Sequence, residues 1–136
     1  MDTSWINEKG NDGFTQLILA AANGHLEAVK ALLKKGAKID GRSKNGATPL
    51  MYATLMKRLD VVQLLLERGA AVDGKSEHGS TPLCFAAHEG YIEVVQLLLR
   101  KGADPHVGTE GKTPLQISVE KGHLEIAELL RKAGAR

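Results

Sequence analysis

One five-residue phrase recurs along this chain at a nearly constant interval. The pattern Gly-x-Thr-Pro-Leu begins at Gly46, Gly79 and Gly111, which are 33 and 32 residues apart, and a weaker copy begins at Gly13. Self-similarity with a period of roughly 20 to 50 residues is the signature of a protein built from stacked repeats. The sequence therefore predicts several similar units, each of which buries its apolar face against a neighbour.

Each unit carries the same signals for two helices. A threonine can accept a backbone N–H as a helix N-cap, and the proline after it occupies the first helical position, where its missing N–H costs nothing. These pairs are Thr48-Pro49, Thr81-Pro82 and Thr113-Pro114. A short first helix then precedes a turn glycine, and a largely apolar second helix ends at another glycine. The turn glycines are Gly24, Gly90 and Gly122, and the terminal ones are Gly36, Gly69, Gly102 and Gly134.

The unit Gly-x-Thr-Pro-Leu, Ala-Ala, Gly-His-Leu-Glu, Val-Val, Leu-Leu-Leu, Gly-Ala-Asp resembles the ankyrin repeat over about residues 13–136. The resemblance implies an all-α fold, an ankyrin-repeat solenoid of stacked helix-turn-helix units with hairpin-like turns between them. We expect an N-terminal tail or partial repeat at residues 1–12, followed by repeats at 13–45, 46–78, 79–110 and 111–136. The last repeat is expected to be a C-terminal cap, because Arg131 stands where the other repeats have leucine.

The first twelve residues contain a partial match to the end of a repeat. Residues 5–7, Trp-Ile-Asn, precede Gly13 at the spacing by which residues 38–40 precede Gly46. Two interpretations are open. The chain is a fragment of a longer array, or the tryptophan and isoleucine fold over the first repeat as a lid.

Three departures from the repeat pattern predict local irregularities. Lys57 replaces the turn glycine, so it is expected to adopt a left-handed conformation at a cost of roughly 1 kcal/mol. The third inter-repeat turn, from Gly102 to Gly111, is one residue short, so it should be tilted or shortened. The family usually has a histidine after Thr-Pro-Leu, and its absence predicts the loss of a polar contact between repeats. The residues at that position are Ile18, Met51, Cys84 and Gln116.

Composition and charge argue against several classes of function. The formal net charge is only +2 and aromatic residues are 4% of the chain, so nothing points to nucleic acid as a partner. No run approaches the roughly 20 apolar residues of a membrane span, so we expect no membrane association. The single cysteine, Cys84, cannot form an internal disulfide, which favours an intracellular location, cytoplasmic or nuclear.

No catalytic or ligand-binding constellation stands out from the repeat. His25 and His123 belong to its own turn, and the other three histidines, His78, His88 and His106, do not have metal-ligand spacing. Cys84 is interpreted as a small apolar residue of a packed helix and not as a nucleophile. We therefore expect a monomer that is not an enzyme and holds no cofactor or metal.

The resemblance implies that the chain binds another protein or peptide on a concave groove and on the tips of the turns. The family's contact positions fall on turn residues and on the exposed ends of the first helices. In this sequence the turn positions include Arg42, Lys44, Asn45, Glu77 and His78, and the helix-end positions include Leu55, Met56, His88 and Glu89.

Leu55 and Met56 are the strongest of these candidates. Other repeats have Asn, Glu or Lys at one or both positions, whereas here two bulky apolar side chains are expected to face solvent, as at many binding sites. Met51 lies nearby in the sequence, and Lys57 with Arg58 would form a polar rim. In the alternative interpretation, Leu55 and Met56 pack onto neighbouring helices.

Charge differs between the repeats. Residues 13–45 carry six basic and two acidic side chains, whereas residues 79–110 carry two basic and four acidic ones. The basic end could steer an acidic partner segment or could simply be solvated surface.

Two further hypotheses assign the chain a different kind of role. Ankyrin repeats are known substrates of an asparaginyl hydroxylase, and the matching turn positions here are Asn7, Asp40, Asp73 and His106. Only Asn7 is the preferred residue. The chain could also be an engineered or reconstructed stack without a dedicated partner, although its irregularities favour natural ancestry.

Overall fold

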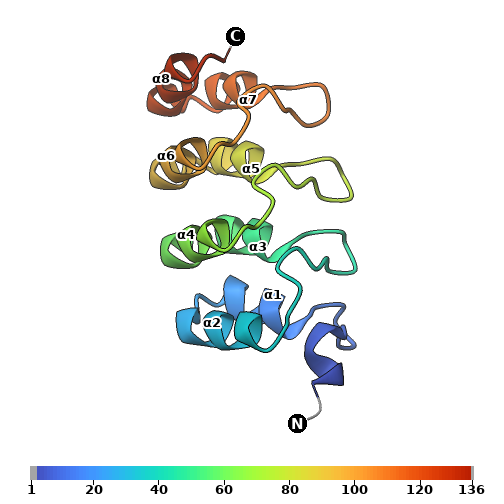
Figure 1. Ribbon diagram of the computed structural model, residues 1–136. Helices are drawn as coiled ribbons and strands as arrows, with labels where there is room; N and C mark the ends of the chain where they lie inside the picture. Colours follow the sequence, from blue (N-terminus) through green and yellow to red (C-terminus); the bar gives the residue numbers. More distant parts are fainter. Residues whose placement is uncertain (1–2, 136) are drawn as a thin grey trace. The chain divides into compact units, whose positions relative to one another are not determined.

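The computed structural model describes residues 3–135, which form two compact units. Unit 1 is Met1–Ala71 and unit 2 is Val72–Arg136. Each unit contains two helix pairs, and each pair consists of a first and a second helix joined by a tight turn (Figure 1). The predicted all-α, repeat-based fold is therefore confirmed.

Unit 1 begins with a short 3-10 helix, η1 (Ser4–Asn7), and then has two helix pairs. These are α1 (Gln16–Ala22) with α2 (Leu26–Lys34), and α3 (Pro49–Leu55) with α4 (Leu59–Glu67). The first helices α1 and α3 pack against each other, as do the second helices α2 and α4. Their shared core contains Leu17, Ile18, Val29, Leu50 and Leu65, all of which are fully buried.

Unit 2 repeats this arrangement. It consists of α5 (Pro82–Glu89) with α6 (Ile92–Arg100), and α7 (Pro114–Glu120) with α8 (Leu124–Lys132). Here α5 packs on α7 and α6 packs on α8. The core contains Leu83, Val95, Leu98, Ile126 and Leu130. Arg131 is exposed and its Nη1 lies 3.0 Å from Glu128 Oε1, so this face of α8 meets water, as predicted.

The first helix of each pair is capped as the sequence predicts. The hydroxyl of each N-cap threonine accepts the backbone N–H three residues on, at N–O distances of 3.2–3.3 Å. The four caps are Thr15, Thr48, Thr81 and Thr113. Proline fills the first helical position in α3, α5 and α7. Glycine at each predicted turn or helix end has a positive φ, which a residue with a Cβ avoids.

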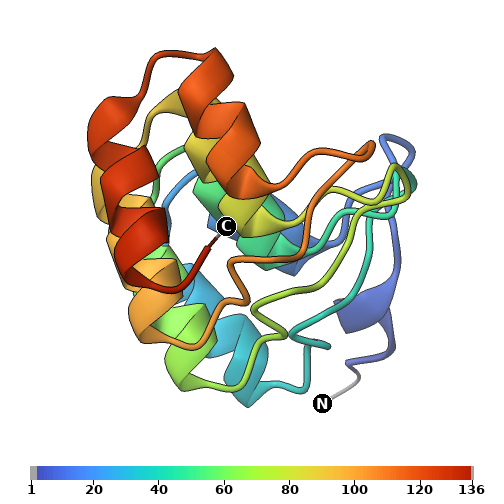
Figure 2. The ribbon, with the colours of Figure 1, turned by 90° about the horizontal axis from the view of Figure 1, so that it is seen from above.

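The hairpin-like turns project from the helices as four fingers, which we define as residues 10–14, 43–47, 76–80 and 109–112. In each of the first three, a backbone N–H bonds the carbonyl four residues on, with N–O distances of 2.8–2.9 Å. Within each unit the fingers point away from the second helices (Figure 2). The base of each finger therefore lies at the N-terminal end of a first helix.

The fourth finger is the short one. Thr109 and Lys112 exchange two backbone hydrogen bonds of 2.9 Å around a two-residue turn, in which Glu110 has φ 50° and Gly111 has φ 78°. Gly108 stands where the longer loops have a lysine or arginine, and a Cβ there would overlap the Lys112 carbonyl oxygen. The predicted shortening of this turn is thus confirmed.

Side chains in the loops join successive repeats within each unit. The carboxamide oxygen of Asn7 accepts the N–H of Lys38 at 2.8 Å, and Asp40 accepts the N–H of Ala71 at 3.0 Å. Asp73 makes the same contact to Asp104 in unit 2, at 3.1 Å. Asn7 therefore occupies the repeat position that the sequence spacing predicts. Ile6 beside it is buried, so this segment folds onto the first repeat.

A second junction lies at the turn between the two helices of a pair. Arg58 Nε donates to the carbonyl oxygen of Ala22 at 3.0 Å in unit 1. His123 Nε2 donates to the carbonyl oxygen of His88 at 3.1 Å in unit 2. These are equivalent positions of the repeat, and each side chain lies over the turn glycine of the repeat before it. A Cβ on Gly90 would come within 2.7 Å of the His123 ring.

Candidate protein-binding site

The unit-2 cavity lies between fingers 3 and 4 and the helices α5 and α7. It is open to solvent and has a volume of about 400 Å³. Its apolar lining comes from Cys84 and Phe85 on α5 and from Ile117 on α7. A hollow with an apolar floor, bounded by two fingers, can bury part of a partner's side chain.

Polar groups surround this apolar floor. His88 and Glu89, at the C-terminal end of α5, line one side, with His88 Nδ1 3.2 Å from Glu89 Oε1. His78 lines the finger side. Three predicted contact residues thus come together around one cavity. Glu77, the fourth candidate in unit 2, is exposed on finger 3 but is not among the lining residues.

Cys84 is part of the packed floor. Its side chain is 2% exposed, and its Sγ donates a weak hydrogen bond to the carbonyl oxygen of Val107 at 3.5 Å. Burial raises the pKa of the Cys84 thiol, and hydrogen bonds to Thr81 oppose this shift only in part. A buried, protonated thiol is a poor nucleophile. The contact to Val107 lies within the repeat of residues 79–110, so the expected loss of a polar contact between repeats stays a prediction.

Unit 1 presents an apolar patch at the equivalent end of α3. Leu55 is 38% exposed and Met56 is 49% exposed, so both reach solvent, as the first interpretation expects. Lys57 next to them has φ 57°, the predicted left-handed conformation. The prediction that Met51 joins this patch is wrong. Met51 is 2% exposed, because the third position of α3 faces the interior.

Arg58 was predicted to form part of the polar rim of this patch, but its side chain packs between repeats. It is half-buried, and its Nε bonds the end of α1 through the Ala22 carbonyl. The position after the turn points back over the preceding repeat, as His123 does in unit 2. Arg58 is therefore part of the packing between repeats, which corrects its assignment to the rim of a binding patch.

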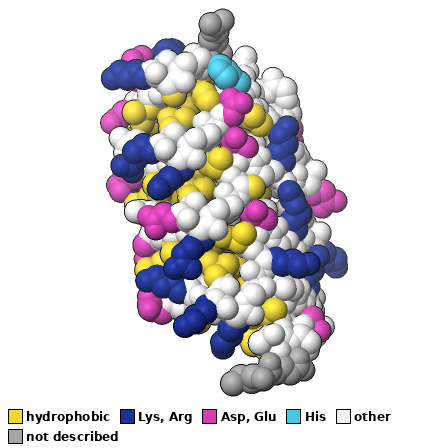
Figure 3. Space-filling model, viewed as in Figure 1, with side chains coloured by type: hydrophobic (Ala, Val, Ile, Leu, Met, Phe, Trp, Pro, Cys, Tyr) yellow, Lys and Arg dark blue, Asp and Glu magenta, His cyan; other side chains and the backbone are white. Residues whose placement is uncertain are grey.

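The remaining candidates in unit 1 lie on finger 2 or, for Arg42, directly before it. Arg42, Lys44 and Asn45 are all exposed. The backbone N–H of Lys44 donates to the Gly13 carbonyl at 2.9 Å, which ties fingers 1 and 2 together. Lysine and arginine side chains gather on the surface that unit 1 forms (Figure 3). The finger is thus a basic edge held in place by its backbone.

Comparison with known proteins identifies the family. A family model described as ankyrin repeats, in three copies, matches residues 2–76 and again residues 70–136. The chain belongs to the ankyrin repeat family. No curated protein matches it. Ankyrin repeats are generally protein–protein interaction modules and are generally not enzymes. The family and the fold predicted from the sequence are therefore confirmed.

The ankyrin positions matched to asparaginyl hydroxylation are engaged within the fold. Asn7 is exposed, but its carboxamide oxygen is bonded to Lys38 N–H, and its Nδ2 lies 3.4 Å from the Gly36 carbonyl. Asp40 and Asp73 are engaged in the same way, and His106 donates its backbone N–H to Asp104. A modifying enzyme would need the Asn7 segment to open. Modification stays a prediction.

Within residues 3–135, no group of three or more His, Cys, Asp or Glu side chains is arranged to hold a metal ion. In the same part of the chain, no helix is both long enough and apolar enough to cross a membrane.

Several cavity residues were not predicted from the sequence. Ser76, Thr109 and Glu110 line the finger side of the cavity. Glu110 reaches the cavity through the short fourth finger, whose missing residue was noted in the sequence. The shortened turn is visible in the sequence, but its spacing alone does not say which residues line a cavity.

Proposed function

We propose that this ankyrin chain is a non-enzymatic binding module whose partner is a segment of another protein. The segment lies across the fingers and the ends of the first helices, with the unit-2 cavity as its main contact. The Leu55–Met56 patch is a second contact surface in unit 1. Both surfaces occupy the same position of the repeat, which lies outside the packed core.

One observation carries this proposal. The cavity of about 400 Å³ has an apolar floor, and three residues at predicted contact positions, His78, His88 and Glu89, stand around it. An apolar hollow with a few polar groups is the usual form of a site that binds a side chain. A pair of fingers also leaves room for an extended backbone.

A peptide selection tests the proposal directly. A random-peptide phage library is selected on the wild-type chain, and the affinity of the recovered peptides is measured by fluorescence anisotropy. We expect the double variant His78→Ala/His88→Ala to lower the affinity by about tenfold or more, because a contact in a partly desolvated hollow contributes over 1 kcal/mol.

Glu93→Ala is the matched control, because Glu93 is exposed on the second helix α6, outside the cavity lining. It should leave the affinity unchanged. The proposal fails if no peptide is recovered, or if the recovered peptides bind the His78/His88 variant as tightly as the wild type.

We further propose that the chain acts inside the cell, in the cytoplasm or nucleus, as a monomer. The support is the single buried cysteine, Cys84, which a reducing compartment keeps as a thiol. Localisation of a fluorescent fusion to the secretory pathway, or a stable dimer in sedimentation, would contradict this proposal.

A further inference from the structure

The polar lining of the unit-2 cavity consists of groups that can accept hydrogen bonds. Two are carboxylates, Glu89 and Glu110, and neither lysine nor arginine is among the lining residues. The others are the hydroxyls of Ser76, Ser80 and Thr109 and the imidazoles of His78 and His88. Two acidic residues therefore line a partly enclosed, apolar hollow, where a charge acts more strongly than on open surface.

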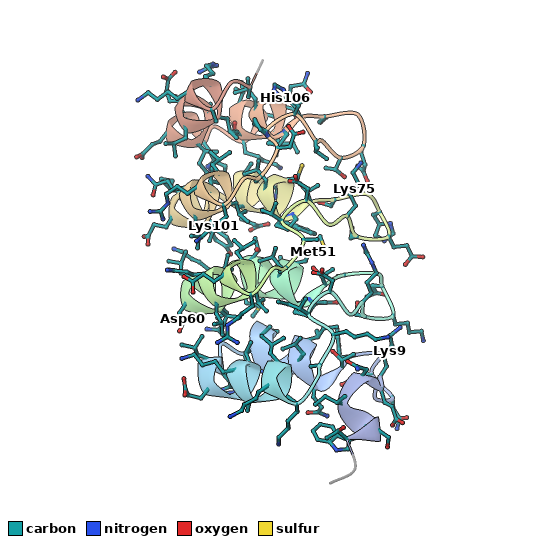
Figure 4. The ribbon with its side chains drawn as sticks, viewed as in Figure 1. Lys9, Met51, Asp60, Lys75, Lys101 and His106 are labelled. Atoms are coloured by element: carbon teal, nitrogen blue, oxygen red, sulfur yellow. The ribbon has the colours of Figure 1, made fainter. Side chains whose placement is uncertain are left out.

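The lysines nearest the cavity lie outside its lining, and one of them, Lys112, interacts electrostatically with Glu110. Lys112 is on finger 4, but its ammonium group lies 2.8 Å from Glu120 Oε2, outside the cavity lining. Lys75 comes from the loop that leads into finger 3, on the finger side of unit 2 (Figure 4). It acts electrostatically on Cys84 but does not line the cavity. Acidic residues also outnumber basic ones by one across residues 72–136.

The floor of the cavity suits a long aliphatic stem. Cys84 is buried, and the half-buried Phe85 and the Ile117 side chain complete the apolar surface. Arginine buries its methylene groups along such a surface while its planar guanidinium binds carboxylates through several N–H donors and stacks on aromatic rings. A volume of about 400 Å³ is large enough for one such side chain.

We infer that the unit-2 cavity takes an arginine side chain from an extended partner segment. The guanidinium faces Glu89 and Glu110, and the aliphatic stem lies on Phe85 and Ile117. This inference rests on the proposed function and names the chemistry of the partner. An acidic segment is disfavoured, because its carboxylates would face two others in the same hollow.

The test uses the peptides selected on the full chain. We expect arginine to be enriched at one peptide position. Replacing that arginine with citrulline, which keeps the shape but removes the charge, should weaken binding by about tenfold or more. The double variant Glu89→Gln/Glu110→Gln should bind the arginine and citrulline peptides with nearly equal affinity.

A charge-matched control separates local contact from long-range attraction. Glu93→Gln/Glu125→Gln changes the net charge equally, at exposed residues in the first turns of α6 and α8. It should keep the preference for arginine over citrulline. If both double variants lose that preference equally, the charge acts at a distance and the inference is overturned.

Two other outcomes also test the arginine site. Peptides that depend on His78 and His88 but show no arginine preference, or that prefer lysine, overturn the arginine site and leave the proposed binding function standing. Failure to recover any binding peptide overturns both.

Discussion

The two units place different chemistry on the same position of the repeat. In unit 1, α3 ends at Leu55, with Met56 as its C-cap, and in unit 2 the equivalent residues are His88 and Glu89. All four side chains are exposed. The first pair forms an apolar patch, whereas the second borders a cavity with an acidic lining.

The difference shows at which positions of the repeat the side chain can vary. The threonine caps are the same in both units, and Arg58 and His123 each bond the carbonyl at the end of the preceding first helix, so these positions satisfy backbone groups in both. At the ends of the first helices α3 and α5 the side chains are exposed instead. Side chains of opposite character are therefore tolerated there, and this is where we expect specificity for a partner to reside.

The largest effect should come from a turn glycine of unit 2. Gly90→Ala adds a Cβ 2.7 Å from the His123 ring at a residue with φ 80°, so both strain and overlap result. We expect the free energy of unfolding to fall by about 3 kcal/mol, measured by urea denaturation. Gly24→Ala in unit 1 should cost less, since the nearest atom belongs to the flexible side chain of Arg58.

Gly122→Ala is the control for this comparison. Gly122 has φ 76° but no atom within 4 Å of the added Cβ, so only the conformational strain of roughly 1 kcal/mol applies. Equal losses in Gly90→Ala and Gly122→Ala would show that the junction between His123 and His88 does not stabilise unit 2.

The next largest effect should be on the rate at which the Cys84 thiol, in the floor of the unit-2 cavity, is alkylated. Burial raises the pKa of Cys84, so iodoacetamide should alkylate it at least about tenfold more slowly in the folded chain than in guanidinium. Because the pKa of Cys84 is higher in the folded chain than in the unfolded chain, the neutral thiol stabilises the fold at pH values below the unfolded pKa. This contribution is lost as the pH rises through the folded pKa.

The stability difference between the wild type and Cys84→Ala should therefore be constant near neutral pH and narrow at pH values above about 9. Rapid alkylation of the folded chain would instead show that the cavity floor opens readily, and the rigid site assumed for unit 2 would have to be abandoned.

A smaller effect should come from the one turn between paired helices that lacks glycine. Lys57 has φ 57°, and Lys57→Gly should raise the free energy of unfolding by about 1 kcal/mol by removing the strain of its Cβ. Lys57→Ala keeps the Cβ and removes the charge, so it should give no comparable gain. Equal gains in both variants would assign the effect to charge.

Much of the fold follows from local chemistry and could be predicted. The threonine caps depend on neighbours within one turn of helix, and so does the left-handed Lys57, where the repeat requires a positive φ. The shortened fourth finger followed from counting residues between Gly102 and Gly111.

The binding surface was less predictable, because it depends on how side chains from different repeats meet. Met51 was misplaced because sequence proximity to Leu55 does not say which face of α3 a side chain occupies. Arg58 was misplaced because its contact lies 36 residues away, in the preceding repeat. The cavity that Glu110 lines exists only once two fingers and two helices are assembled.

The smallest stability effect should come from the residues that differ most between the units. Leu55→Ala/Met56→Ala and His88→Ala/Glu89→Ala are matched double variants at equivalent, exposed positions. Each substitution should change the free energy of unfolding by only about 0.5 kcal/mol, and the melting temperature should stay within a few degrees of the wild type. Binding of the selected peptides should nevertheless fall in both variants, more strongly in the unit-2 pair, because only that pair borders a cavity.

A fall of several kcal/mol in the free energy of unfolding, confined to the Leu55/Met56 variant, would show that these side chains pack on neighbouring helices. The patch of unit 1 would then be structural, and binding would rest on unit 2 alone.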